Sequence, residues 1–119
     1  MLALAITLTT PATAQIIPTG TPAADILLSQ AITEHRTFLV CSVLDPATHA
    51  LIADAWRRDA AAAAAILTAN DAPPENLLPA PETPFADVVK LCTSNPGWQQ
   101  DWQTLRFTVL ALKLPQAFE

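Results

Sequence analysis

The sequence contains no tyrosine, two glycines and two histidines, and these shortages limit the chemistry that the protein can perform. Gly20 and Gly97 stand too far apart to build a phosphate-binding loop. The serines at positions 29, 42 and 94 lie in no nucleophile elbow. CxxCH and HExxH motifs are also missing, which excludes covalent c-type haem and a zincin-type metal site. We therefore expect no enzyme, no metal site and no cofactor.

Basic residues are scarce as well. The chain has 6 Lys and Arg against 11 Asp and Glu, which gives a formal net charge of -5. This balance argues against binding to nucleic acid or to an anionic membrane surface. Hydrophobic residues make up 51% and charged residues 14%, so the composition is not that of a disordered chain. The length of 119 residues suits one domain.

The first basic residue is Arg36, and the N-terminus before it reads as an export signal. Residues 1–14 contain a short apolar run, then Pro11 and a small-x-small tripeptide at positions 12–14, the pattern that signal peptidase recognises. We expect a signal peptide over 1–14, followed by one helical domain over 15–119 in the periplasm or outside the cell. A signal peptide usually begins with basic residues, and this one has none. Either the natural start of the protein lies further upstream, which we favour, or the signal peptide is a weak one. An alternative is that the first ten residues form a buried helix or strand.

No membrane span is expected, because the apolar run is far shorter than the ~20 residues that a bilayer requires.

Cys41 and Cys92 are the only cysteines. An even number in an oxidising compartment predicts one disulfide bond. A metal site is a weaker alternative, because about fifty residues separate the two and no cysteine or histidine lies beside either. In the chain-entropy treatment, a disulfide bond that closes a loop of this length stabilises the fold by ~4 kcal/mol, because it restricts the unfolded chain.

Proline positions predict where helices begin. A side-chain oxygen before proline is typical of a helix start, because the oxygen accepts a free amide and proline fits the first turn. Such pairs are Thr21-Pro22, Asp45-Pro46, Thr83-Pro84 and Asn95-Pro96. They predict an all-α fold, a small four-helix up-down bundle. Its helices cover 23–44, 47–69, 85–94 and 97–114, the third is short, Pro115 closes the last, and a Pro-rich loop over 70–82 joins the second and third.

Apolar spacing predicts the buried faces of these helices. In 23–44, Leu28 and Val43 belong to the expected core face, while Glu34 and Thr37 belong to the opposite face. The alanine run 60–65 predicts a surface on which a neighbouring helix packs closely. Arg58 is expected to pair with Asp54 one turn earlier, on a solvated face.

The helix predicted over 97–114 is apolar on two sides, so it is either the central helix of the bundle or covers a partner. Its candidate partner-binding residues are Trp98, Trp102, Arg106, Phe107 and Leu110. The spacing of Trp98, Trp102 and Arg106 allows a cation–π contact, and the same spacing is ordinary for core aromatics.

His35 and Asp59 form the one polar constellation of interest. If the first two helices make an antiparallel hairpin about Asp45, then Asp59 lies about one turn from the position opposite His35. One interpretation of this pair is a pH-responsive or ligand-binding site. The alternatives are a buried pair whose two members hydrogen-bond to each other, or an Asp59 that reaches the solvent at the edge of the bundle. His49 is expected to be exposed.

Two segments resemble known families. The cysteine spacing and the segment TPFADVVKLCT resemble the HdeA-type acid-stress chaperones of the periplasm, which implies a disulfide-linked helical fold and client binding at low pH. The segment VVKLCTSNPGW, followed by an apolar helix, is similar to small periplasmic immunity proteins of type VI secretion. We transfer no residue role from either resemblance.

Three functions follow as expectations. The favoured one is a small exported binding or accessory protein that holds a protein or peptide partner on an apolar helical face. The second is a pH-responsive ligand binder or small enzyme centred on His35 and Asp59. The third is a structural subunit of an exported complex. The partner and the oligomeric state stay open.

Overall fold

The computed structural model describes residues 16–77 and 84–119, and within these ranges the fold contains helices and no strand. The predicted signal peptide and part of the predicted Pro-rich loop lie outside the described residues. The elements, in chain order, are α1 (Pro22–Cys41), α2 (Pro46–Ala69), the 3-10 helix η1 (Pro74–Leu77), α3 (Phe85–Ser94), α4 (Trp98–Gln103) and α5 (Leu110–Ala117). The predicted all-α class is confirmed.

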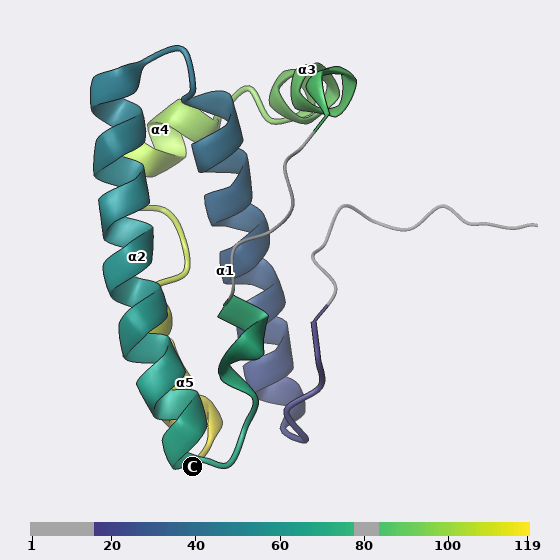
Figure 1. The fold of residues 1–119 in the computed structure, drawn as a ribbon, viewed down its shortest axis with the longest axis vertical. Coiled ribbons are helices and arrows are strands. Elements are labelled where there is room, and N and C mark those ends of the chain that lie inside the picture. The colour runs from purple at the N-terminus through teal and green to yellow at the C-terminus, as the bar shows by residue number, and fades with distance from the viewer. Residues whose placement is uncertain (1–15, 78–83) are drawn as a thin grey trace, which may run out of the picture.

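Helices α1 and α2 form a long antiparallel hairpin, and the other helices lie along it (Figure 1). α5 packs against both members of the hairpin near the end of α2, and α4 packs against α1 closer to the turn. α3 packs against α1 at the end of the molecule where α1 meets α2. The hairpin is therefore the frame on which every C-terminal element is placed.

The two long helices begin where the cap and proline pairs predict. α1 begins at Pro22 and α2 at Pro46, each with proline in the first turn. Asp45 caps α2, because its Oδ1 accepts the amide of Thr48 (3.3 Å) and its Oδ2 accepts the Thr48 hydroxyl (2.6 Å). These bonds satisfy a helix amide that has no partner within the helix.

The other two pairs mark helix starts less accurately. α3 begins at Phe85, one residue after the proline, with Pro84 at the N-cap position. α4 begins at Trp98, two residues after Pro96, with Gly97 at the N-cap. Asn95 ends α3 instead of capping α4, because its side-chain amide donates to the Leu91 carbonyl (2.8 Å).

The prediction of one continuous helix over 97–114 is wrong. α4 ends after six residues, and Leu105 takes the left-handed conformation with φ 58°. The backbone amide of Arg106 donates to the backbone carbonyl of Asp101 (2.8 Å), and the amide of Leu105 donates to the carbonyl of Trp102 (3.2 Å). This is the bonding pattern of a Schellman helix end. Pro115 does not close the last helix but lies inside α5.

The hydrophobic core lies between α1, α2 and α5. Its buried members are Ala24, Leu28, Ala31, Ala63, Leu67, Ala72, Leu110 and Leu114. Four of these eight are alanines, and the three that lie in α1 and α2, Ala24, Ala31 and Ala63, have short side chains that let the helices approach closely. The alanine run contributes Ala63 to this core, while Ala61 and Ala65 are exposed.

Two predictions for α1 need correction. Val43, expected in the core, lies beyond the end of α1 and is 55% exposed. Thr37, expected on the solvent face, is buried, because α3 packs against α1 and supplies cover that the hairpin alone lacks. Its hydroxyl donates to the carbonyl of Thr33 (3.0 Å).

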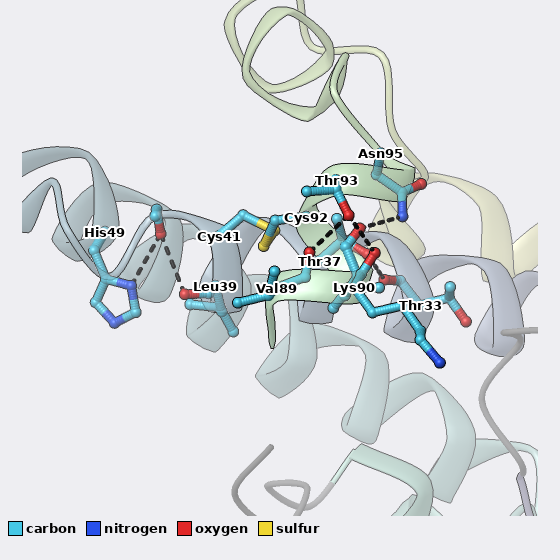
Figure 2. The surroundings of a disulfide bond; sticks show 12 residues. Thr33, Thr37, Leu39, Cys41, His49, Val89, Lys90, Cys92, Thr93 and Asn95 are labelled. Atoms are coloured by element: carbon cyan, nitrogen blue, oxygen red, sulfur yellow. Dashed lines mark hydrogen bonds between the residues drawn. A yellow bond between two sulfur atoms is a disulfide. The ribbon is translucent and has the colours of Figure 1, made fainter. Parts of the chain in front are cut away.

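The predicted disulfide bond is confirmed. Cys41 at the end of α1 is bonded to Cys92 in α3, with 5.6 Å between their Cα atoms (Figure 2). Thr93 and Asn95, which follow Cys92, have side chains that bond to carbonyls of α3 itself. The bond therefore joins two helices far apart in sequence and fixes α3 to α1.

We expect the native protein to have no free thiol and to lose thermal stability on reduction, because the bond limits the unfolded chain and fixes α3 to α1. Differential scanning fluorimetry with and without reductant measures the change in Tm. The double variant Cys41→Ser, Cys92→Ser is the control, and reductant should leave its Tm unchanged. Stoichiometric thiol labelling of the native oxidised protein would contradict the prediction.

Asp45→Ala should lower Tm more than Thr21→Ala does. Both residues are N-caps, but in the described part of the chain Thr21 makes no side-chain capping bond. The bonds from the Thr48 hydroxyl and amide lower the pKa of Asp45 below 3.8, so its stabilisation is complete above that pH and is lost as the pH falls further. Thermal melts at pH 7 and pH 3 test both points, and equal losses for the two variants would disprove the role of the carboxylate.

Candidate functional site

Six rings gather between α1, α2 and the segment that contains α4. They are His35, Phe38, Trp56, Trp98, Trp102 and Phe107, and we call them the ring cluster. The cluster contains every tryptophan of the chain. Its members come from four separate stretches of sequence, so it forms only when the C-terminal part of the chain packs on the hairpin.

His35 contacts three other rings of the ring cluster, one from each of α1, α2 and the stretch between α4 and α5. Its imidazole stacks on Trp56 of α2, with ring centres 4.7 Å apart and planes at 26°. Phe38, one turn further along α1, and Phe107 meet the imidazole edge-on at 5.6 Å and 5.1 Å. Phe107 in turn stacks on Trp102 at 5.5 Å. These are the geometries that aromatic pairs prefer.

The imidazole of His35 is 2% exposed, and neither ring nitrogen has a hydrogen-bond partner in the part of the chain that the structure describes. Burial lowers the pKa of His35 below 6.5, because the charged ring has lost its water. The charges of Asp59 and Glu34 and the backbone of Thr108 act in the opposite direction, and burial outweighs them. The folded protein therefore favours the neutral ring.

Two carboxylates beside the ring cluster fasten the C-terminal part of the chain. Glu34 on α1 accepts the amide of Thr108 at 2.7 Å. Asp59 on α2 accepts the amides of Leu110 (2.8 Å) and Ala111 (2.9 Å), one on each oxygen. These are the first two amides of α5, so Asp59 caps a helix that begins 51 residues later.

The predicted pair of His35 and Asp59 is brought close enough for the aspartate charge to act on the ring, but no hydrogen bond joins the two among the described residues. Both Asp59 oxygens are used by α5 instead. The role of Glu34 was not predicted, because its helical spacing indicates the solvent face. No sequence signal pointed to this role, because Thr108, whose amide Glu34 accepts, was expected inside a continuous helix.

The predicted partner-binding residues are mostly turned inward. Leu110 is completely buried in the core, so it cannot belong to an exposed face. Trp98, Trp102 and Phe107 are half-buried and contact one another or Phe38 in the ring cluster. Arg106 is exposed and takes no part in the described ring contacts. The physical reason is the break after α4, which turns this apolar segment onto the hairpin.

Large apolar side chains are exposed at the opposite end of the molecule from α5. Of the nine exposed large hydrophobic residues in the described ranges, five lie where α1 ends, where α2 begins, or on α3. We call these five the apolar end: Val43, Leu44, Leu51, Phe85 and Val89. Figure 1 shows α3 beside the end of α1 from which the turn to α2 begins. Leu44 is 94% exposed and Phe85 81%, the two highest values of the nine.

Ser42 and His49 form a second polar contact beside the disulfide bond. The Ser42 hydroxyl lies 2.9 Å from Nδ1 of His49 and donates to the Leu39 carbonyl at 3.3 Å (Figure 2). His49 is half-buried, contrary to the expected exposure. A serine and a histidine at this distance resemble a nucleophile and its base, but Ser42 is 1% exposed, so a substrate cannot reach its oxygen. The contact fixes the turn between α1 and α2.

An open groove of about 500 Å³ lies between α2 and η1. Alanines of α2, three residues of η1 and the Arg57 side chain line it. Arg57 and Arg58 both pair with Asp54, the latter at 2.8 Å, which confirms the predicted pairing on an exposed face. The surface of the groove is mostly apolar and contains few polar atoms that could orient a ligand.

The described residues contain no group of three or more His, Cys, Asp or Glu side chains that could hold a metal ion. None of the helices within 16–77 and 84–119 is long and apolar enough to cross a membrane.

Comparison of the chain with known protein families, curated proteins and solved structures finds no match.

Asp59→Ala should destabilise the protein by about 2 to 4 kcal/mol, because it leaves two helix amides without acceptors and one of them belongs to fully buried Leu110. Asp54→Ala is the matched control and should change stability by less than about 0.5 kcal/mol, since its ion pairs are exposed. Urea unfolding of the two variants measures the difference. Similar losses at both positions would contradict the capping role of Asp59.

Proposed function

We propose that this protein is a small exported binding protein that holds a protein or peptide partner on its apolar end. The observation that carries the proposal is the exposure of Leu44 and Phe85 on a fold whose other large side chains are mostly packed. An exposed group of large apolar residues on an otherwise packed domain is typical of an interaction surface. Aromatic residues such as Phe85 are common anchors in such surfaces.

The helix α3 adds a second reason. Phe85, Val88, Val89 and Cys92 follow the spacing of one helix face, which is the pattern of a helix that packs against a neighbour. Cys92 is bonded to α1, but Phe85 is exposed and Val89 is 47% exposed. This face therefore has apolar area left over after the protein has folded, and a partner would cover it.

Export is supported by the disulfide bond between Cys41 and Cys92, because such bonds persist in the periplasm and outside the cell. A non-enzymatic role is supported by the burial of the two groups best suited to chemistry. Ser42 and the ring of His35 are each at most 2% exposed, so neither offers a substrate a reactive atom at the surface. The binding role thus accounts for the exposed residues without requiring a catalytic one.

The site can be located by photo-crosslinking in the cells that make the protein. A photoreactive phenylalanine analogue replaces Leu44 or Phe85 in the apolar end, or Leu112 on α5 as the control, since Leu112 is also 71% exposed. We expect one discrete crosslinked partner from the first two positions and none from the third. The purified partner is then titrated by calorimetry.

In that titration, Leu44→Asp and Phe85→Asp should each weaken binding at least about tenfold, which corresponds to about 1.4 kcal/mol. Leu112→Asp should bind as the parent protein does. Thermal melts show whether each variant is folded, and both apolar-end variants should be, because the side chains that they replace are mostly in water. Equal crosslinking from all three positions, or unchanged affinity in both apolar-end variants, would refute the proposal.

A further inference from the structure

The histidine in the ring cluster is an unusual choice for its place. A neutral imidazole has one donor and one acceptor, and at His35 both are buried without a partner in the described structure. Each such group costs free energy relative to an apolar ring of the same size. Phenylalanine would make the same contacts with Trp56, Phe38 and Phe107 without this cost. What phenylalanine lacks is the ability to take up a proton near neutral pH.

The acceptors near His35 are the ones that fasten the C-terminal part of the chain, residues 104–119, which we call the C-terminal segment. Asp59 on α2 and Glu34 on α1 are the charged groups that act on the ring, and both oxygens of Asp59 and one of Glu34 accept amides of this segment. The segment itself contributes the backbone of Thr108. A protonated imidazole has two donors, and it can satisfy them only from these groups or from water.

The walls of the ring cluster differ in the backbone that carries them. Phe38 and Trp56 belong to the two long helices of the hairpin. Phe107 lies between α4 and α5, in a stretch that is not helical, and follows Leu105 with its left-handed backbone. Water or a reoriented imidazole can therefore be admitted at the lowest cost by moving Phe107 away from the hairpin.

We propose that His35 and the rings around it form an acid-sensitive latch: when the imidazole takes up a proton, the C-terminal segment leaves its position on α1 and α2. The protonated ring competes with Thr108, Leu110 and Ala111 for the carboxylates of Glu34 and Asp59. Release also uncovers the partners of Phe107 in the ring cluster, Trp102 among them. This inference does not depend on the apolar end or on its partner.

The direction of the pH dependence follows from the pKa of His35, which burial holds below 6.5 in the latched state. The released state has a ring in water and binds more protons, so it gains population as the pH falls below 6.5. For a single proton the equilibrium between the two states changes by up to about tenfold per pH unit, until the latched form itself is protonated.

Hydrogen exchange followed by NMR on the whole chain tests the latch. Protection factors, corrected for the intrinsic pH dependence of exchange, are measured for the amides of Thr108, Leu110 and Ala111 between pH 7.5 and pH 5. We expect them to decrease by about tenfold per pH unit below pH 6.5. The amides of Thr37 and Ile52, which are buried in the hairpin outside the core that Leu110 and Leu114 complete, should keep their protection. Equal loss at these two positions would mean global acid unfolding and would overturn the proposal.

His35→Phe should remove the pH dependence at the three amides, while His49→Gln, which changes the only other histidine, should leave it in place. A pH response that survives in His35→Phe, or disappears in His49→Gln, overturns the latch. If His35→Phe does not fold, the ring proton resonances of His35 in the natural protein decide. They must titrate together with the loss of protection, and titration without any loss refutes the proposal.

Discussion

The arrangement of the C-terminal part of the chain depends on one interaction, the capping of α5 by the carboxylate of Asp59 on α2. Val109 at the N-cap offers no acceptor, so the first amides of α5 would otherwise be left without partners, one of them on fully buried Leu110. An unsatisfied buried donor costs about 1 to 3 kcal/mol. Because Leu110 and Leu114 complete the core between α1 and α2, the cap and the core form together.

Local sequence patterns predicted the parts of the fold that depend on local interactions. The starts of α1 and α2 were correct because a capping residue and a proline act within one turn of the helix. The break after α4 was not predictable in this way. Leu105 adopts a left-handed backbone, which costs leucine about 1 kcal/mol and which sequence patterns assign to glycine. Its compensation comes from Phe107 in the ring cluster and from Glu34, contacts that are distant in sequence.

The candidate site shows the same division. The antiparallel hairpin was enough to predict that His35 and Asp59 lie near each other, since helix geometry fixes the register. The bonds of Asp59 could not be predicted, because they go to amides of a segment whose break was not foreseen. For the same reason the apolar residues after position 97 were predicted to form one helix that is either central in the bundle or covers a partner, whereas Trp102 and Phe107 pack inward after a break and Leu110 is in the core.

The two ends of the hairpin are stabilised in different ways, and this difference explains where apolar surface is left. At the end that holds α5, hydrophobic packing and two carboxylates fix the chain, and the leucines that face the hairpin are buried. At the other end a covalent bond fixes α3 to α1. A covalent bond keeps a helix in place without requiring that its apolar side be covered, so Phe85 and Val89 can remain in contact with water. If packing alone held α3, its apolar side would have to face α1, and Phe85 and Val89 would not add to the exposed side chains of Val43, Leu44 and Leu51.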